Sequence, residues 1–368
     1  MLTRFGMWLV ATVSALAADQ AALDPAFRIV RDAVKKDEVP GAIALVARRG
    51  TILRHEAMGW SDPLERVPFT TNTLCWIASI TKPVTVAATM ALIDQGKLAL
   101  DDPIEKFLPE FKQQTDGEGK HHVVTVRHIM THTSGLPVNP PTRRSGWPIG
   151  GALDSSWLQK DWDEIMRDTA RTPLRFAPGS KFEYSNGAFF VLGRIIEKVS
   201  GRPFAAHVKQ AILDPLGMDD THFAPPMSIA QRVSPIYAET GGKRSMIFRF
   251  NPRLKIVNTA PDGGLFSYPE QIAKFAQMFL DDDGRVLSKD AVKEMLKEQR
   301  PGRGLGWALQ DGVFMHEGSS GTLVWGDPKT GVVGALFFQF RDQKDAASRL
   351  RNEFRAAVQK AFAGGERK

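Results

Sequence analysis

The amino-acid sequence predicts an α+β fold in which one sheet is assembled from the two ends of the chain. Strand-like runs occur near the N-terminus, at residues 42–47 and 51–59, and again in the last third of the chain. The stretch between them has the longer apolar period of helices. A helical centre between two groups of strands is typical of an α+β architecture.

The N-terminal elements follow from apolar spacing and turn residues. A helix is expected over residues 22–36, because apolar side chains recur on one of its faces. Arg48-Arg49-Gly50 separates the two N-terminal strands and is a hairpin signal. A second helix is expected over residues 84–94. Pro83 occupies its first turn, where the missing N–H costs nothing, and Gly96 ends it.

The remaining elements alternate in the same way. Three central helices are predicted: residues 188–199, residues 204–213, and one that opens within residues 267–270 and runs to residue 280. Four strands are predicted at residues 305–310, 313–316, 322–325 and 332–340. A last amphipathic helix is expected over residues 346–362. Residues 138–151 are rich in Pro, Gly and Arg and predict a loop, which either borders a substrate cleft or is a surface excursion.

Composition indicates an ordinary globular protein with ample material for a core. The chain has 368 residues, 43% hydrophobic and 24% charged, with a formal net charge of +7 and a pI of about 9.4. Such a surface favours anionic partners such as cell-envelope polymers. The basic residues are dispersed, so no nucleic-acid partner is expected. The single cysteine, Cys75, excludes an internal disulfide and is interpreted as a small buried filler.

The first 17 residues have the pattern of a secretory signal peptide. Arg4 supplies a positive n-region, residues 5–13 are apolar, and Ala15-Leu16-Ala17 is a small-residue cleavage site. The apolar run is shorter than the roughly 20 residues that span a bilayer, so no stable membrane anchor is expected. The protein is therefore predicted to be secreted or periplasmic, with cleavage after Ala17.

The strongest chemical signal is Ser79-Ile80-Thr81-Lys82. A serine hydroxyl needs an adjacent base to act as a nucleophile. Residues three apart share one face of a helix, so Lys82 can reach Ser79 across a turn. Ser79 is the only serine with a lysine three residues on. The competing interpretations are a helix N-cap serine and a surface lysine.

Two further motifs follow in the order that serine acyl transfer requires. Tyr184-Ser185-Asn186 offers a proton-shuttling tyrosine, although Tyr184 could instead be a core residue and Asn186 a turn residue. His316-Glu317-Gly318 comes next and is followed by small residues, as expected where a strand edge approaches a substrate. The sequence holds no G-x-S-x-G elbow and no H-E-x-x-H motif, and His121-His122 lacks metal-ligand spacing. Neither a metal nor an organic cofactor is predicted.

With these motifs the chain resembles the serine β-lactamase-like hydrolases, which include class C β-lactamases, penicillin-binding proteins of the DD-peptidase type and family VIII carboxylesterases. The resemblance runs from about residue 39 to residue 340. Its further landmarks are residues 131–137, 176–179, 214–218 and 262–265. It implies a β-lactamase/DD-peptidase-like fold, in which an antiparallel sheet built from both termini is flanked by helices and carries an all-α insertion. On this basis the sheet domain comprises residues 18–97 and 255–368, and the mainly helical domain residues 98–254.

The resemblance also implies roles for the motif residues. Ser79 would form an acyl-enzyme, with Lys82 and Tyr184 sharing the general-base and general-acid roles. Asn186 would contact Lys82 and the substrate, as His316 and Gly318 would on the sheet side. The backbone N–H groups of Ser79 and Ser319 would form the oxyanion hole. The stretch with His132 and Ser134 would be structural.

A rival third motif, Lys329-Thr330-Gly331, spells the triplet of true β-lactamases. It lies between two predicted strands and is interpreted as a hairpin turn, which leaves His316 as the candidate. His316 is mostly neutral near pH 7, and Glu317 adds a negative charge, so a substrate carboxylate is expected to bind less well there. Alternatively, Glu317 points away from the pocket and decides nothing.

These arguments favour a small-molecule substrate of the ester type, or a related acyl compound. The alternatives are a D-Ala-D-Ala carboxypeptidase, a D-aminopeptidase, a β-lactamase, or a non-catalytic binding or sensor protein with the same fold.

Overall fold

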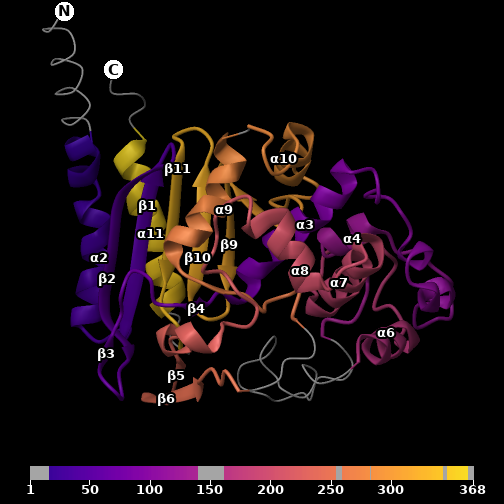
Figure 1. Ribbon diagram of the computed structural model, residues 1–368, viewed down its shortest axis with the longest axis horizontal. Coiled ribbons are helices and arrows are strands. Elements are labelled where there is room, and N and C mark those ends of the chain that lie inside the picture. Colours follow the sequence, from indigo (N-terminus) through magenta and orange to yellow (C-terminus); the bar gives the residue numbers. More distant parts are fainter. Residues whose placement is uncertain (1–15, 140–160, 254–258, 282, 343–345, 364–368) are drawn as a thin grey trace, which may run out of the picture.

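The structure is a computed structural model that describes residues 16–139, 161–253, 259–281, 283–342 and 346–363 (Figure 1). Nearly all of the predicted signal peptide, residues 1–17, lies outside these ranges. Most of the predicted loop at residues 138–151 lies outside them as well.

A seven-stranded sheet forms the frame of the molecule, in the order β3-β2-β1-β11-β10-β9-β8. Every neighbouring pair in it is antiparallel. The central pair joins the two ends of the chain: β1 (Gly41–Arg48) runs beside β11 (Val332–Phe337), with Leu45 opposite Ala335. This confirms the predicted α+β fold with an antiparallel sheet built from both termini. The other strands are β2 (Thr51–Asp62), β3 (Val67–Pro68), β8 (Ala308–Gln310), β9 (Val313–Gly318) and β10 (Thr322–Asp327).

The two terminal helices cover one face of the sheet. They are α2 (Asp24–Lys35) and α11 (Ala346–Phe362), which lie beside one another and close over a shared apolar core. Phe27 and Phe354 meet edge to face within it, with ring centroids 5.4 Å apart. The predicted hairpin at residues 48–50 is present, and Arg49 and Gly50 both have positive φ, as a tight turn between β1 and β2 requires.

A larger apolar core lies on the opposite face. There α9 (Pro269–Asp281) packs against β1, β10 and β11. The helical region stands beside the sheet in Figure 1. It consists of α3 (Thr81–Asp94), α4 (Val126–Met130), α6 (Trp162–Arg171), α7 (Asn186–Ser200) and α8 (Phe204–Val208), and α10 (Lys289–Leu296) lies next to α3. The predicted central helices correspond to α7, to α8 with the π-helical turn Lys209–Leu213 that follows it, and to α9.

Two predicted strands are shorter than expected. The one predicted at residues 332–340 ends at Phe337, because Gln339 adopts a φ of 54° and its side-chain amide bonds both backbone groups of Trp76. The chain then enters β12 (Phe340–Asp342), which pairs with the hairpin of β5 (Ile236–Thr240) and β6 (Lys243–Phe248) in a second sheet. That hairpin was not predicted. The strand predicted at residues 305–310 begins only at Ala308, after Gly306 with a φ of 74°.

Candidate active site

Ser79 and Lys82 lie at the junction between a tight turn and a buried helix. Ser79 belongs to the 3₁₀ turn Ala78–Ile80, which leads directly into α3 at Thr81, with Pro83 in the first turn of α3 as predicted. The residues of α3 are apolar on all sides and nearly all are buried, so the helix forms the centre of the helical region. Lys82 is therefore fully buried with its ammonium group facing Ser79.

The Lys82 ammonium group has three hydrogen-bond acceptors around it. It donates to Ser79 Oγ at 3.2 Å, to Asn186 Oδ1 at 2.8 Å and to the Asp262 carbonyl oxygen at 2.7 Å. Burying a charge is costly unless it is well paired, and these three bonds satisfy all three N–H groups. The three short bonds hold the amine against the serine hydroxyl.

Tyr184 and Asn186 reach the same point from the start of α7. The Ser185 hydroxyl caps α7 by accepting from the Ala188 N–H at 2.9 Å, and Asn186 is the first residue of the helix. The Tyr184 ring centroid lies 4.7 Å from Lys82 Nζ. The structure thus brings together four of the predicted residues, Ser79, Lys82, Tyr184 and Asn186, from the segments where α3 and α7 begin.

The β9–β10 turn closes the site from the sheet side. The Ser320 hydroxyl donates to the Trp76 carbonyl at 2.6 Å, and the Thr322 hydroxyl donates to the Ile77 carbonyl at 3.1 Å. A Cβ on Gly318 would lie 2.4 Å from the Ile77 carbonyl oxygen, so only glycine allows this approach. Ser319 and Gly318 are consequently held next to the segment that carries Ser79, and all three line one pocket.

His316 projects from β9 into this pocket as a neutral imidazole. Burial, with a smaller contribution from the charge of Lys82, lowers the pKa of His316 to about 3. Its Nδ1 lies 2.8 Å from the Glu317 carbonyl oxygen, which can only accept. The proton of the neutral ring therefore sits on Nδ1, and Nε2 is left as a hydrogen-bond acceptor.

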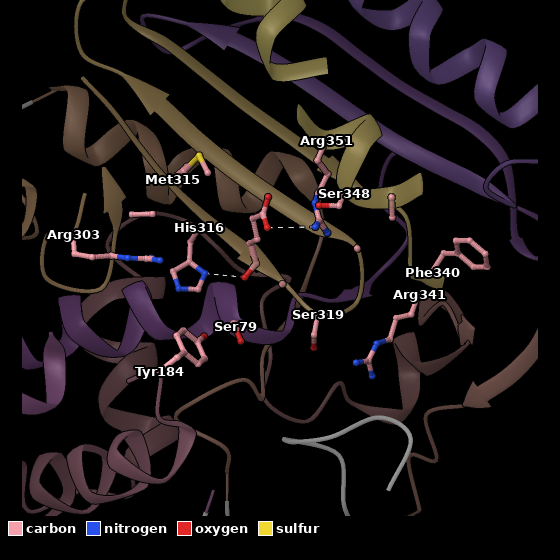
Figure 2. Close-up of a pocket in the computed structure, with 15 residues that line it drawn as sticks. Ser79, Tyr184, Arg303, Met315, His316, Ser319, Phe340, Arg341, Ser348 and Arg351 are labelled. Carbon is pink, nitrogen blue, oxygen red and sulfur yellow. Dashed lines mark hydrogen bonds and ion pairs between the residues drawn. The ribbon is translucent and has the colours of Figure 1, made fainter. Parts of the chain in front are cut away.

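The pocket has a volume of about 500 Å³, and three cations that were not predicted line it. Arg303, Arg341 and Arg351 line it together with Ser79, Tyr184 and His316 (Figure 2). Sequence reasoning missed these arginines. A signal existed for Arg351, which falls on the apolar face of α11 four residues after the buried Ala347.

Glu317 is paired with an arginine that was not among the predicted site residues. Its side chain is on the α11 side of β9, where its carboxylate pairs with Arg351 Nη2 at 3.3 Å (Figure 2). Its charge is thereby offset, and Arg303 and Arg341 line the pocket as well. Glu317 is itself among the residues that line the pocket, so the alternative that it points away from the pocket does not hold, and weaker binding of a substrate carboxylate stays a prediction.

Other sequence candidates lie away from the pocket. Lys329-Thr330-Gly331 is in the turn between β10 and β11, as predicted, at the opposite end of β10 from Gly318; its backbone N–H groups bond the Asp327 side chain and carbonyl. Cys75 is buried, and burial raises the pKa of its thiol.

Among the residues described, no group of three His, Cys, Asp or Glu side chains could hold a metal ion. Within the same ranges, none of the helices combines the length and the apolar character of a membrane span.

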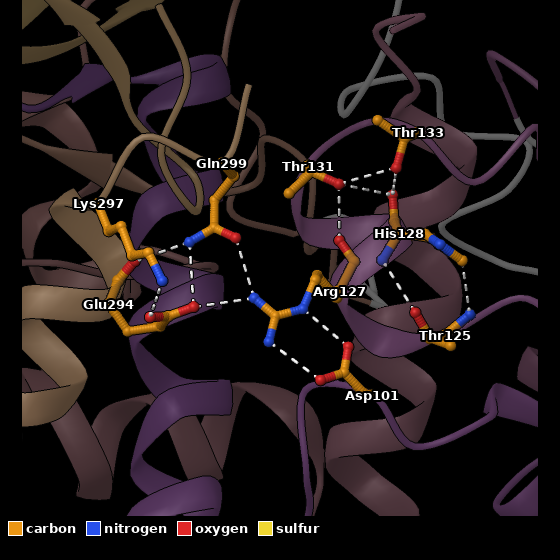
Figure 3. A network of polar contacts seen from close by, with 9 residues as sticks. All are labelled: Asp101, Thr125, Arg127, His128, Thr131, Thr133, Glu294, Lys297 and Gln299. Carbon is orange, nitrogen blue, oxygen red and sulfur yellow. Dashed lines mark hydrogen bonds and ion pairs between the residues drawn. The ribbon is translucent and has the colours of Figure 1, made fainter. Parts of the chain in front are cut away.

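A polar network joins α4 to α10 and to the segment that follows α10 (Figure 3). Arg127 of α4 pairs with Asp101 at 2.8 Å and with Glu294 of α10 at 2.8 Å, and it also donates to Gln299 at 2.9 Å. Gln299 lies at the base of the loop that carries Arg303. The network therefore connects α4 to the loop on the sheet side of the pocket.

The fold and this serine–lysine–tyrosine cluster define the class of the protein. The Beta-lactamase family model matches residues 26–358. The chain therefore belongs to the Beta-lactamase family, the group of serine hydrolases to which its sequence motifs are similar.

Its relatives include an esterase and a penicillin-binding protein. Esterase EstB of Burkholderia gladioli is 38% identical over 221 residues, which is 57% of this chain and 54% of EstB. Penicillin-binding protein 4* of Bacillus subtilis is 28% identical over 292 residues, 75% of this chain and 61% of that protein. These matches span little more than half the length of each relative.

Solved structures share the fold along nearly the whole chain. EstCE1, described as a hydrolase with promiscuous acyltransferase activity, superposes with a TM-score of 0.80 at 21% identity, covering 93% of this chain and 99% of EstCE1. An octameric penicillin-binding protein homologue from Pyrococcus abyssi gives 0.72 at 26% identity, covering 92% of this chain and 78% of that one. Both confirm the β-lactamase/DD-peptidase-like fold.

Proposed function

We propose that this protein is a hydrolase that forms an acyl-enzyme on Ser79 and acts on carboxylic esters or related acyl compounds. One observation carries the proposal: the fully buried Lys82 donates to Ser79 Oγ while Tyr184 lies against the same ammonium group. A buried amine between a hydroxyl and a phenol can take up the serine proton once the amine or the phenol is in its basic form. The structural alternative, a lysine kept only for packing, does not account for its bond to the serine.

The reaction proceeds in two steps. Ser79 Oγ attacks the acyl carbonyl carbon, and its proton passes to the basic form of the Lys82–Tyr184 couple, in which either the amine or the phenol has given up its proton to solvent. The negative charge on the carbonyl oxygen is stabilised by the backbone N–H groups of Ser79 and Ser319. The couple then returns the proton to the leaving alcohol as the ester C–O bond breaks. In the second step water attacks the acyl-enzyme by the reverse proton path, which releases the acid and regenerates Ser79.

The substrate class is argued from the sheet side of the pocket and from the relatives. His316 is neutral and offers an acceptor, so this position lacks the cation that a lysine would supply. The similarity to esterase EstB supports an ester substrate. D-Ala-D-Ala peptidase activity is the second candidate, because Arg303 and Arg341 in the pocket lining would attract a carboxylate-bearing peptide.

The test is a comparison of kcat/KM for p-nitrophenyl butyrate, an acetylated D-Ala-D-Ala peptide and a chromogenic cephalosporin. The proposal predicts the highest value for the ester and no turnover of it by Ser79→Ala. Faster hydrolysis of the peptide or the cephalosporin would overturn the ester assignment while leaving the Ser79 acyl-enzyme in place.

We also propose that the protein is exported. This is supported by the Arg4 n-region, the apolar residues 5–13 and the Ala15-Leu16-Ala17 site. N-terminal sequencing of the protein from its native host tests it: a start at Ala18 is expected, and an unprocessed N-terminus in the cytoplasm would contradict it.

A further inference from the structure

His132 lies at the end of α4 in a backbone conformation that is uncommon for a residue other than glycine. Its φ is 55°, and its side chain is buried with 8% exposed. Neighbouring backbone groups fix this conformation: the His132 N–H donates to the Ile129 carbonyl at 3.0 Å, and the Thr133 N–H donates to the His128 carbonyl at 2.8 Å. The Arg127 network anchors the same short helix to α10 (Figure 3). His132 is therefore held rigidly.

Three different parts of His132 contact three consecutive residues around the candidate tyrosine. The His132 carbonyl accepts from the Glu183 N–H at 2.9 Å. The imidazole ring stacks on the Tyr184 ring, with centroids 4.3 Å apart and planes inclined by 25°. The ring atom Nδ1 accepts from the Ser185 N–H at 3.1 Å. His132 thus contacts the Tyr184 ring and also bonds the backbone of the residues immediately before and after Tyr184.

The bond from the Ser185 N–H to His132 Nδ1 requires a neutral imidazole. Nδ1 can accept from the Ser185 N–H only when it carries no proton, so the proton of the ring is on Nε2. Burial, and then the charges of Lys82 and Arg303, hold the pKa of His132 well below its usual value. Protonation would break the bond to Ser185 and add a second cation beside Lys82.

We propose that His132 is the positioning residue for Tyr184, which it holds over the Lys82 ammonium group in the geometry needed for proton transfer. This inference rests on the proposed function, in which Tyr184 and Lys82 share the proton of Ser79. Its consequence is kinetic. A tyrosine displaced by about 1 Å still leaves a pocket that binds substrate, but proton transfer through it slows by as much as roughly 10²-fold. The loss therefore falls on kcat rather than on KM.

The experiment distinguishes the contribution of the stacked His132 ring from that of its hydrogen-bond acceptor, Nδ1. In His132→Asn the amide oxygen can still accept from the Ser185 N–H, and asparagine tolerates positive φ, but the stacked ring is gone. His128→Asn is the matched control, because His128 belongs to the same helix, accepts from the Thr125 N–H through Nδ1 at 3.1 Å and does not line the pocket. Thermal unfolding, kcat, KM and the pH profile of kcat/KM are measured for both variants and the wild type on the ester.

His132→Asn is expected to lower kcat at least ~10-fold with KM little changed, and to move the pH of half-maximal kcat/KM. His128→Asn is expected to keep the wild-type kcat and pH profile at a similar melting temperature. A wild-type kcat and pH profile in His132→Asn would overturn the inference, as would equal losses in both variants that follow their stability. A wild type without Ser79-dependent turnover would instead contradict the proposed function, so the two failures are distinguishable.

Discussion

The two walls of the pocket differ in how their polar groups are held. On the helical wall a single buried cation, Lys82, is surrounded by three acceptors within 3.2 Å. On the sheet wall, which is formed by β9, the loop before β8, β12 and α11, the lining cations are arginines, and Arg351 pairs with Glu317 at 3.3 Å. A fully buried amine with three hydrogen-bond partners suits proton transfer, whereas arginines in the lining of a pocket suit recognition of a substrate. We therefore propose that the helical wall carries out proton transfer and that the sheet wall selects the substrate.

The two histidines of the site repeat this difference. On the helical wall His132 has its proton on Nε2, because Nδ1 accepts from the Ser185 N–H. On the sheet wall His316 has its proton on Nδ1, because Nδ1 faces the Glu317 carbonyl. The acceptor nitrogen of His132 therefore bonds protein backbone, while the acceptor nitrogen of His316, Nε2, can bond a ligand. The same type of residue thus contacts protein backbone on one wall and, on our proposal, a substrate on the other.

The largest effect is expected from Lys82 on the helical wall. Lys82→Met removes the proton carrier beside Ser79 and should lower kcat/KM for the ester about 10³-fold. Lys329→Met is the matched control, since Lys329 belongs to the rival triplet in the β10–β11 turn. Steady-state kinetics on both variants decide the point. A comparable loss in Lys329→Met would mean that the wrong lysine has been assigned to the chemistry.

A smaller effect is expected where the two walls meet, at Gly318. A Cβ there would lie 2.1 Å from Thr322 Oγ1 and 2.4 Å from the Ile77 carbonyl oxygen, so Gly318→Ala must move Ser319 relative to Ser79. A loss of about 10² in kcat is expected. Gly117→Ala is the control, because nothing lies within 4 Å of its Cβ position. Unchanged kcat in Gly318→Ala would show that the close approach of β9 is not needed.

A change on the sheet wall alone should alter selectivity rather than chemistry. Arg303→Gln is expected to lower the kcat/KM of a carboxylate-bearing phenyl ester about 5-fold relative to its uncharged analogue, the size of a partly exposed ion pair. Arg167→Gln removes the same charge from α6, away from this pocket, and should leave the ratio unchanged. If Arg303→Gln lowered kcat/KM equally for both esters, Arg303 would contribute to the chemical step rather than to the selection of a charged substrate.

The smallest effect concerns acid stability on the sheet wall. The unfolded His316 ring takes up its proton near pH 6.5 and the folded ring only near pH 3, so the unfolded state binds the extra proton between these values. The stability that the neutral ring contributes is complete above pH 6.5 and is lost as the pH falls towards 3. His316→Asn should reduce the pH slope of the unfolding free energy by at most about 1.4 kcal/mol per pH unit near pH 5.

Urea unfolding between pH 4 and 7 measures this slope. His121→Asn is the control at an exposed position outside the pocket. An identical slope in wild type and His316→Asn would contradict the low pKa of His316.

The sequence predicted the helical wall better than the sheet wall for a physical reason. The Ser79–Lys82 spacing is local, and one helical turn suffices to place both side chains. The last helix was likewise predicted over residues 346–362, the bounds that α11 has. The contact of Arg351 with Glu317, by contrast, joins residues 34 positions apart and depends on how α11 packs over β9.

The same distinction explains the other differences. The end of β11 depends on Gln339 bonding Trp76, 263 residues earlier, and no local pattern around residue 338 indicates it. The β5–β6 hairpin had a signal in Gly241-Gly242 between alternating residues, but a stretch interpreted as mainly helical concealed it. The stacking of His132 on Tyr184 joins residues 52 positions apart, so it depends on the tertiary fold and not on a local sequence pattern.

The central claim, that Ser79 is the acylated nucleophile, is tested most directly by mass spectrometry of the protein treated with a fluorophosphonate ester. The account predicts one adduct per chain, located on the peptide that contains Ser79, with no adduct on Ser79→Ala and strongly slowed labelling of Lys82→Met. An unlabelled wild type, or an adduct that persists in Ser79→Ala, would contradict it.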